Sequence, residues 1–272
     1  MRAPRGRGRP LVGLDVLSVA IAGAPIAADS NIDKRMDWRF LDLRRPEQNL
    51  VFRVQSTFEH ALRTYRVDND FIELHTLKLM ASASESNAEL FEVKYLEGTA
   101  FLARSSQFFN RMAQPAGFGK VFEVGPACRA DPSFTSRHAK EFNSVDAEVS
   151  WIDSHEDVMN LHENLLAAGL TAIKAKHGDE ITALSDVEVT VPTTPFPRIP
   201  FAEAKRIVAE RSYEVLRADD NPSTTKSYDL IVNGAEISTG AQREHRIEVF
   251  EQQARDGGRD PRELGFYLDF FC

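Results

Sequence analysis

Hydrophobic residues recur at helical spacing through positions 46–65. Pro46 suits the first turn of a helix, where its missing N–H costs no hydrogen bond. The apolar positions that follow predict one face of a long amphipathic helix: Leu50, Val51, Val54, Phe58, Ala61, Leu62 and Tyr65. Polar residues at 68–70 end this helix, and the run 71–75 predicts a strand.

Two strands joined by a long polar loop give the clearest sheet signal. Residues 121–124 predict a short strand, which we expect Gly125 and Pro126 to close. Strict alternation over 143–151 predicts a half-buried antiparallel strand with one acidic, polar face. The polar segment 129–142 lies between these two strands.

The second half of the chain adds helices and one more strand. Ser154 with Asp157 is typical of a capping box, and we expect the helix that it opens to end at His177 and Gly178. Prolines make 190–200 a loop; 228–232 then predicts a strand, 234–240 a tight polar turn and 241–254 a helix. The fold class is α+β, a mainly antiparallel sheet with helices against one face.

Composition narrows the function classes. The 272 residues allow one large domain or two small ones, and 42% of them are hydrophobic, enough for a sizeable core. A net charge of −8 disfavours non-specific nucleic-acid binding, although it leaves room for a local basic groove. Two cysteines, Cys128 and Cys272, exclude a disulfide scaffold and a Cys-rich zinc site. The sequence has no uninterrupted apolar run of membrane-spanning length, and its free thiols fit a cytoplasmic protein.

The N-terminal residues resemble a secretory signal in part. Four arginines precede an apolar-rich stretch, but Asp15 and Pro25 interrupt it. We therefore favour a remnant strand or linker over residues 1–28, and expect one domain over residues 29–272.

One group of candidate residues lies at 129–142. Arg129 at the end of one strand and Phe142 at the start of the next would face the same sheet surface. Arginine binds phosphate oxygens through two hydrogen bonds, and a phenylalanine ring offers a surface on which a base stacks. Asp131 would orient the arginine or meet an amine. An ordinary hairpin with a solvated, charged tip explains these residue types equally well.

A second group lies at 236–243. Glu236, Ser238 and Thr239 offer oxygen ligands of the kind that Mg²⁺ binds, and Arg243 would hold a carboxylate. A capped helix N-terminus, with Ser238 or Thr239 as the cap, is the alternative that these residues alone slightly favour.

Two weaker groups complete the survey. Glu85 in the polar run 82–85 and Gln107 after a strand form a weak candidate site. His155-Glu156 and His162-Glu163 are seven residues apart on one predicted helix, too far for one metal, and predict a solvated face.

Four segments together resemble aspartyl-tRNA synthetases of the archaeal and eukaryotic type, which are class II aminoacyl-tRNA synthetases. They occur in the family's order and the resemblance covers nearly all of the chain from about Asp33: MDWRFLDLRRPE (36–47), SASE (82–85), VFEVGPACRADPSFTSRHAKEF (121–142) and GAEISTGAQREHR (234–246). The resemblance implies the class II catalytic domain, an antiparallel sheet flanked by helices. It also implies ATP-dependent activation of aspartate to aspartyl-adenylate, followed by transfer to the acceptor end of tRNA.

The resemblance implies an ATP site over 129–142. Arg129 matches the arginine that holds the α-phosphate and the substrate carboxylate, and Phe142 matches the ring under adenine. Asp131 stands where the family has glutamate, and His138 matches the loop residue near the ATP phosphates, with Arg137 beside it. Arg129, Asp131 and His138 are therefore the candidate catalytic residues.

The resemblance also implies a metal and an amino-acid site. Glu236 matches a ligand of Mg²⁺ and ATP, and Thr239 stands where the family has a serine that serves both metal and substrate. Glu85 matches the loop acid that meets the amino group of aspartate, and Gln107 matches a glutamine of the same site. Arg243 matches the arginine that pairs with the side-chain carboxylate.

Two departures from the family concern single residues. Asn110 stands where the family has the lysine that joins Arg243 on the substrate carboxylate. Because one cation is absent, a shift from aspartate toward a neutral side chain such as asparagine is open. Leu77 replaces the proline that ends motif 1, whose helix at 46–65 implies a homodimer.

Larger departures concern missing segments. The 272 residues hold no anticodon-binding barrel, have a shortened stretch between Ile207 and Asp219, and lack the arginine-bearing motif 3 expected after Phe271. We therefore expect a catalytic domain incomplete at its C-terminus, weakly active or inactive and poorly soluble. Three hypotheses stay open: an aspartate–tRNA ligase with impaired activity, a tRNA-independent paralogue resembling asparagine synthetases, and a non-catalytic dimerising or binding fragment. None of them needs a membrane.

Overall fold

The computed structural model describes residues 23, 25–27, 29–81, 90–130, 139–204, 206, 227–232, 235–243 and 246–256. The chain divides into two compact units, Met1–Arg53 and Val54–Cys272. Most of residues 1–28 lies outside the described residues, so the remnant at 1–28 stays a prediction. No helix in the described ranges is long and apolar enough to cross a lipid bilayer.

The first unit contains α1 (Ile32–Asp37), α2 (Arg39–Asp42) and the start of α3 (Pro46–Asp68). Asp42 is completely buried and accepts hydrogen bonds from Arg35 Nε at 2.9 Å and Arg39 Nη1 at 2.6 Å. These guanidinium groups hold the pKa of Asp42 below its usual range. Pro46 is the first residue of α3 and Asp68 the last, so both predicted ends of this helix are confirmed.

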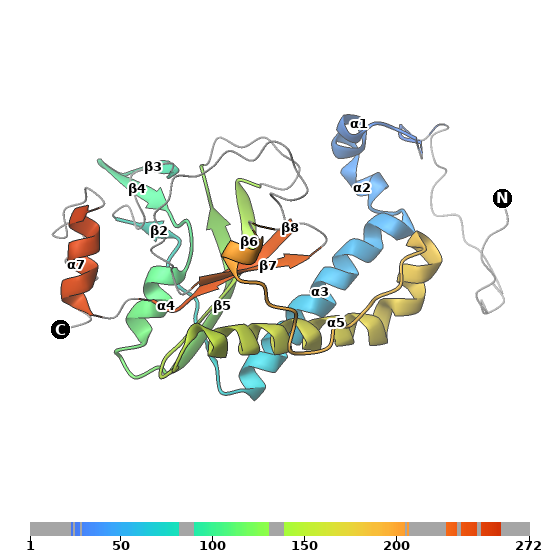
Figure 1. Ribbon diagram of the computed structural model, residues 1–272. Coiled ribbons are helices and arrows are strands. Elements are labelled where there is room, and N and C mark those ends of the chain that lie inside the picture. Colours follow the sequence, from blue (N-terminus) through green and yellow to red (C-terminus); the bar gives the residue numbers. More distant parts are fainter. Residues whose placement is uncertain are drawn as a thin grey trace. The chain divides into compact units, whose positions relative to one another are not determined.

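The described strands of the second unit fall into three sheets (Figure 1). The central sheet has the order β1 (Ile72–Glu73), β5 (Lys120–Cys128), β6 (Glu141–Val149), in which β1 pairs parallel and β6 antiparallel with β5. A second, antiparallel sheet has the order β2 (Leu79–Met80), β4 (Gly98–Leu102), β3 (Glu92–Tyr95). The antiparallel strands β7 (Ser227–Val232) and β8 (Ala235–Ala241) form a separate two-stranded sheet.

Helices α4 (Gln107–Ala113), α5 (His155–Ser185) and α7 (Ile247–Asp256) accompany these strands. Helix α4 packs on β5 and β6, and α5 contacts β8. The predicted α+β class with a mainly antiparallel sheet is confirmed, with the short parallel β1–β5 pair as an addition.

Strand β5 does not close at Gly125 and Pro126 as predicted, but continues to Cys128. Cys128 N donates to Ala103 O at 3.0 Å, away from β6, so the backbone nitrogens of even-numbered residues in β5 face that side. The nitrogen of Pro126 therefore faces away from β6, so the missing N–H removes no hydrogen bond from the β5–β6 ladder. Proline is tolerated in a sheet at such a position.

Two other predicted boundaries are wrong. Residues 234–240 were expected to form a turn, but 235–241 form β8, and the next helix begins at Ile247 instead of 241. Helix α5 runs past His177 and Gly178 to Ser185. An interior glycine costs a helix only ~1 kcal/mol, and His177 is buried with its Nε2 2.9 Å from Thr57 Oγ1 of α3.

The predicted alternation along β6 is confirmed, but its burial is unusual. Ser144, Asp146 and Glu148 are partly buried beneath α4, whereas Val145 on the opposite face is 37% exposed. The acidic row thus points toward other protein groups, which requires hydrogen-bonding or ionic partners for each carboxylate.

Helices α3 and α5 pack closely against each other at Gly169. A Cβ atom at this position would overlap the ring of Phe58 and lie 3.1 Å from Leu62 Cδ2.

Ser154 is the N-cap of α5, and the predicted capping box is present. Its hydroxyl accepts a hydrogen bond from Glu156 N, and Asp157 Oδ2 accepts one from Ser154 N at 3.0 Å.

Gly169→Ala should therefore lower the free energy of unfolding by about 1–3 kcal/mol, because the added methyl group overpacks the α3–α5 contact. Gly178→Ala is the matched control on the same helix, where the nearest atom is Lys174 Cγ at 3.7 Å. The control should gain about 0.5–1 kcal/mol from helix propensity. Urea unfolding followed by circular dichroism measures both, and equal stability of the two variants would contradict the packing argument.

Candidate functional site

Arg129 and Phe142 lie on one face of the central sheet, as the sequence predicted. The register pairs Ala127 with Phe142, so Arg129, two residues further along, points to the same side. Arg129 Cζ lies 5.1 Å from the centroid of the Phe142 ring, and Arg129 N donates to Lys140 O at 2.8 Å. The guanidinium therefore lies over the ring, and an arginine in such an aromatic contact can still donate hydrogen bonds to phosphate.

Four of the residues expected near this pair fall outside the described residues. These are Glu85, Asp131, Arg137 and His138. Their roles stay predictions.

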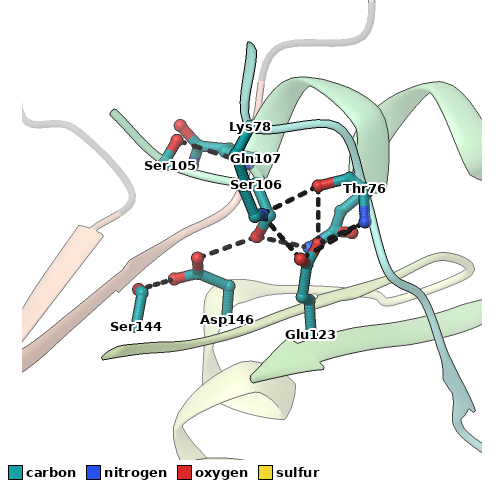
Figure 2. Close-up of polar contacts among 9 residues, drawn as sticks. Thr76, Lys78, Ser105, Ser106, Gln107, Glu123, Ser144 and Asp146 are labelled. Carbon is teal, nitrogen blue, oxygen red and sulfur yellow. Dashed lines mark hydrogen bonds and ion pairs between the residues drawn. The ribbon is translucent and has the colours of Figure 1, made fainter. Parts of the chain in front are cut away.

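Further along the same face, polar side chains of α4 and β6 form a hydrogen-bonded chain (Figure 2). Ser106 Oγ donates to Asp146 Oδ2 at 2.9 Å, and Ser144 Oγ donates to Asp146 Oδ1 at 2.9 Å. Asn110 is completely buried, and its Nδ2 donates to Ser106 Oγ at 3.1 Å, while its Oδ1 has no hydrogen-bond partner among the described residues. Gln107 opens α4 beside Ser106 and is half-buried. The predicted amino-acid-binding residues Gln107 and Asn110 thus lie three residues apart on α4.

Glu123 of β5 faces Asp146 directly across the sheet and is 3% exposed. Three donors hold its carboxylate: Lys78 Nζ at 2.6 Å, Thr76 Oγ1 at 2.7 Å and Thr76 N at 3.3 Å (Figure 2). Two like charges that face each other across a sheet are unfavourable, so the Lys78 ion pair offsets this repulsion.

Arg243 belongs to the same neighbourhood through Glu148. Burial raises the pKa of Glu148, and the charges of Arg111 and Arg243 oppose that rise. Arg111 Nε is 3.6 Å from Glu148 Oε1. The β6 face therefore offers the Arg129–Phe142 pair at one end and an arginine–carboxylate group at the other.

The hairpin of β7 and β8 brings the predicted metal ligands Glu236 and Thr239 to one face. Three residues apart in a regular strand, they would point to opposite sides. The pairing shifts by one residue at Ile237, because Leu230 pairs with Ser238 and Ile231 with Glu236. This bulge returns Glu236 to the exposed face that Thr239 occupies.

Asp229 is a candidate metal ligand that the sequence reasoning missed. It pairs directly with Thr239 across the hairpin and is exposed on the same face as Glu236. Two carboxylates and a hydroxyl group supply oxygen ligands that suit Mg²⁺, so the residues present fit such an ion. The described residues contain no group of three His, Cys, Asp or Glu side chains that would bind a metal alone. The signal available in sequence was a lone acid within the strand 228–232, which becomes informative only once the register is known.

The acidic side of α5 is not the solvated face that the sequence predicted. Arg198, from the proline-rich loop that returns along α5 in Figure 1, donates from Nη2 to Glu163 Oε1 at 2.8 Å and to Asn160 Oδ1 at 2.6 Å. It also bonds Glu156. Glu163 is 6% exposed, so the helix face is occupied by this loop.

His162 of α5 meets Tyr228 of β7. His162 Nδ1 and Tyr228 Oη are 3.0 Å apart. Burial lowers the pKa of His162, with a further lowering by the Arg66 charge and an opposing effect of Glu163. Burial also raises the pKa of Tyr228 to about 12. At neutral pH both side chains are therefore uncharged in the folded protein.

Comparison with known proteins assigns the family. Residues 31–220 match the family of class II tRNA synthetases (D, K and N). The aspartate–tRNA(Asp/Asn) ligase of Aeropyrum pernix is 34% identical over 95% of this chain and 69% of its own length. The aspartate–tRNA(Asp) ligase of Pyrococcus abyssi is 33% identical with the same coverage. Among solved structures, asparaginyl-tRNA synthetase from Pyrococcus horikoshii complexed with asparaginyl-adenylate has a TM-score of 0.83 at 25% identity, over 93% of this chain and 68% of that one.

The chain is thus a class II aminoacyl-tRNA synthetase in fold and sequence. It belongs to the aspartate, lysine and asparagine group of that class, whose members use ATP to activate an amino acid for tRNA. The resemblance found in the sequence and the expected catalytic-domain fold are both confirmed.

Acidification should destabilise the protein through His162. Its pKa is lowered in the folded state, so the unfolded chain binds a proton more readily below the ordinary value of about 6.5. The contribution of His162 to the free energy of unfolding is therefore fully present above that value. It is lost as the pH drops from about 6.5 toward the lowered pKa. Urea unfolding between about pH 8 and 5.5 should show a smaller loss for His162→Gln than for the wild type. Parallel pH profiles of the two proteins would rule out this contribution of His162.

Proposed function

We propose that this chain is an aspartate–tRNA ligase that forms aspartyl-adenylate from aspartate and ATP. In this reaction a carboxylate oxygen of the amino acid attacks the α-phosphorus, the bond to the bridging oxygen breaks, and pyrophosphate leaves. Such a step depends mainly on positioning and on neutralising phosphate charge.

The observation that carries the proposal is the Arg129–Phe142 pair on the central sheet. Phe142 offers one face of a ring to adenine, and Arg129 beside it offers a fixed cation to the α-phosphate. The group at α4 and β6 lies on the same face, so an amino acid bound there would present its carboxylate toward Arg129. His138, Asp131 and Arg137 would extend the ATP site, and Glu85 would meet the amino group.

Magnesium is the second part of the proposal. Glu236, Thr239 and Asp229 would hold the ion on the exposed face of the hairpin. When bound, it would neutralise phosphate charge on ATP.

Asparagine is a second candidate substrate, favoured by the surroundings of Asn110. Asn110 brings no charge to this group, and the donors to the neighbouring Asp146 are hydroxyl groups of Ser106 and Ser144. A neutral side-chain amide needs no opposing cation, whereas a carboxylate would add a further negative charge beside Asp146.

The assembly and location follow from the same proposal. Val51, Phe52 and Val67 of α3 are exposed, and we propose that this helix forms a homodimer interface in a cytoplasmic enzyme. We propose that the activated amino acid is transferred to tRNA and that this chain contacts only the acceptor end of the tRNA.

Pyrophosphate exchange into ATP tests adenylate formation directly. The wild-type chain should catalyse exchange with aspartate or asparagine, and the preferred amino acid identifies the substrate. Arg129→Lys keeps the charge but loses the flat, two-pronged donor, and exchange should fall about 10²–10³-fold.

Arg255→Lys is the matched control, because Arg255 forms an exposed ion pair with Glu251 on α7. It should leave exchange unchanged. A folded wild-type chain without exchange for either amino acid would refute the proposed ligase activity and favour a binding fragment.

A further inference from the structure

The β7–β8 hairpin has one face toward α5 and one exposed face with the candidate metal ligands. Tyr228, Leu230, Ser238 and Gly240 form the more buried face, and α5 contacts β8. A two-stranded hairpin is marginally stable by itself, so the contacts on its buried face determine how it is held.

Tyr228 makes two contacts on the buried face and one hydrogen bond to a residue of the exposed face. Its Oη lies 3.0 Å from His162 Nδ1 of α5, and the two rings meet edge to face with centroids 5.9 Å apart. Its ring covers Gly240, where a Cβ atom would come within 2.6 Å of Tyr228 Cε1. Its backbone carbonyl accepts a hydrogen bond from Thr239 Oγ1 at 3.0 Å. Tyr228 therefore links the buried face of the hairpin to the candidate metal ligand Thr239.

The other side of this contact is held firmly. His162 is partly buried near Arg66 of α3, and the next residue, Glu163, is fixed by Arg198. Arg66 is 3% exposed and its guanidinium stacks 5.2 Å from the Phe122 ring of β5. The segment of α5 that carries the imidazole is thus held by the Arg198 ion pair at the next residue.

We propose that Tyr228 is a positioning residue for the Mg²⁺ site. Through its hydroxyl on His162 and its ring over Gly240, it sets the register and tilt at which Asp229, Glu236 and Thr239 present their oxygens. This inference rests on the proposed function only for the identity of the ion and the reaction.

Three substitutions separate the hydrogen bond from packing. Tyr228→Phe keeps the ring over Gly240 but loses the hydroxyl, and His162→Leu removes the partner. His162→Gln restores a polar side chain that reaches a hydroxyl group. Tyr95→Phe, at an exposed tyrosine of β3, is the matched control.

Two readouts measure metal binding in these variants. The first is the Mg²⁺ concentration that half-saturates pyrophosphate exchange, with the KM for the amino acid measured alongside. The second is the water-proton relaxation enhancement of Mn²⁺–ATP on addition of the protein without amino acid, which needs no turnover.

Tyr228→Phe and His162→Leu should raise the half-saturating Mg²⁺ concentration about 3- to 10-fold, the effect of one net hydrogen bond. They should weaken Mn²⁺–ATP binding to a similar extent with an unchanged KM for the amino acid, while His162→Gln and Tyr95→Phe stay near the wild type. Metal dependence equal to the wild type in both disrupting variants, or a fall in kcat alone, would overturn the positioning role.

If the wild type shows no exchange, the ligase proposal fails. Mn²⁺–ATP binding by the variants then still decides whether Tyr228 positions the metal ligands. Absence of relaxation enhancement in the wild type itself would refute the metal site and the inference together.

Discussion

The antiparallel pairing of β5 with β6 is the constraint on which the site depends. Its register runs from Lys120 opposite Val149 to Cys128 opposite Glu141 without a shift. An unbroken register keeps every second side chain on one face, so the Arg129–Phe142 stack and the acidic row of β6 share a surface. A slip by one residue would separate the stacked pair and turn the carboxylates toward the opposite face.

This register also concentrates negative charge, and the surrounding elements respond to it. Glu123 and Asp146 face each other, and Glu148 follows on the same strand. Each carboxylate has a different type of partner: Lys78 and Thr76, two serine hydroxyls, and Arg111. Buried charges that keep such partners rarely add stability compared with apolar packing, so their presence here indicates a binding surface more than a core.

Local patterns predicted much of this arrangement. The ends of α3 follow from Pro46 and the polar run after it, and the α5 capping box follows from Ser154 and Asp157. The shared face of Arg129 and Phe142 follows from counting residues along two strands. These features depend only on neighbours in the sequence.

Features that depend on distant partners were missed. The extension of β5 through Pro126 requires knowing which side of the strand lacks a neighbour. The bulge at Ile237 that aligns Glu236 with Thr239, and the place of Asp229 opposite Thr239, exist only in the β7–β8 pairing. Glu163 reads as a solvated acid until the loop with Arg198 lies against it.

The two sides of the candidate site are therefore stabilised by different means. The ATP side rests on a long strand ladder whose backbone hydrogen bonds fix Arg129 and Phe142. The proposed metal side rests on a short, bulged strand pair, which Tyr228 holds against His162 of α5. Segments held by few side-chain contacts open more readily than a ladder does. Because metal ligands must converge within a few tenths of an ångström, the hairpin is the part of the site whose function depends most on individual side-chain contacts.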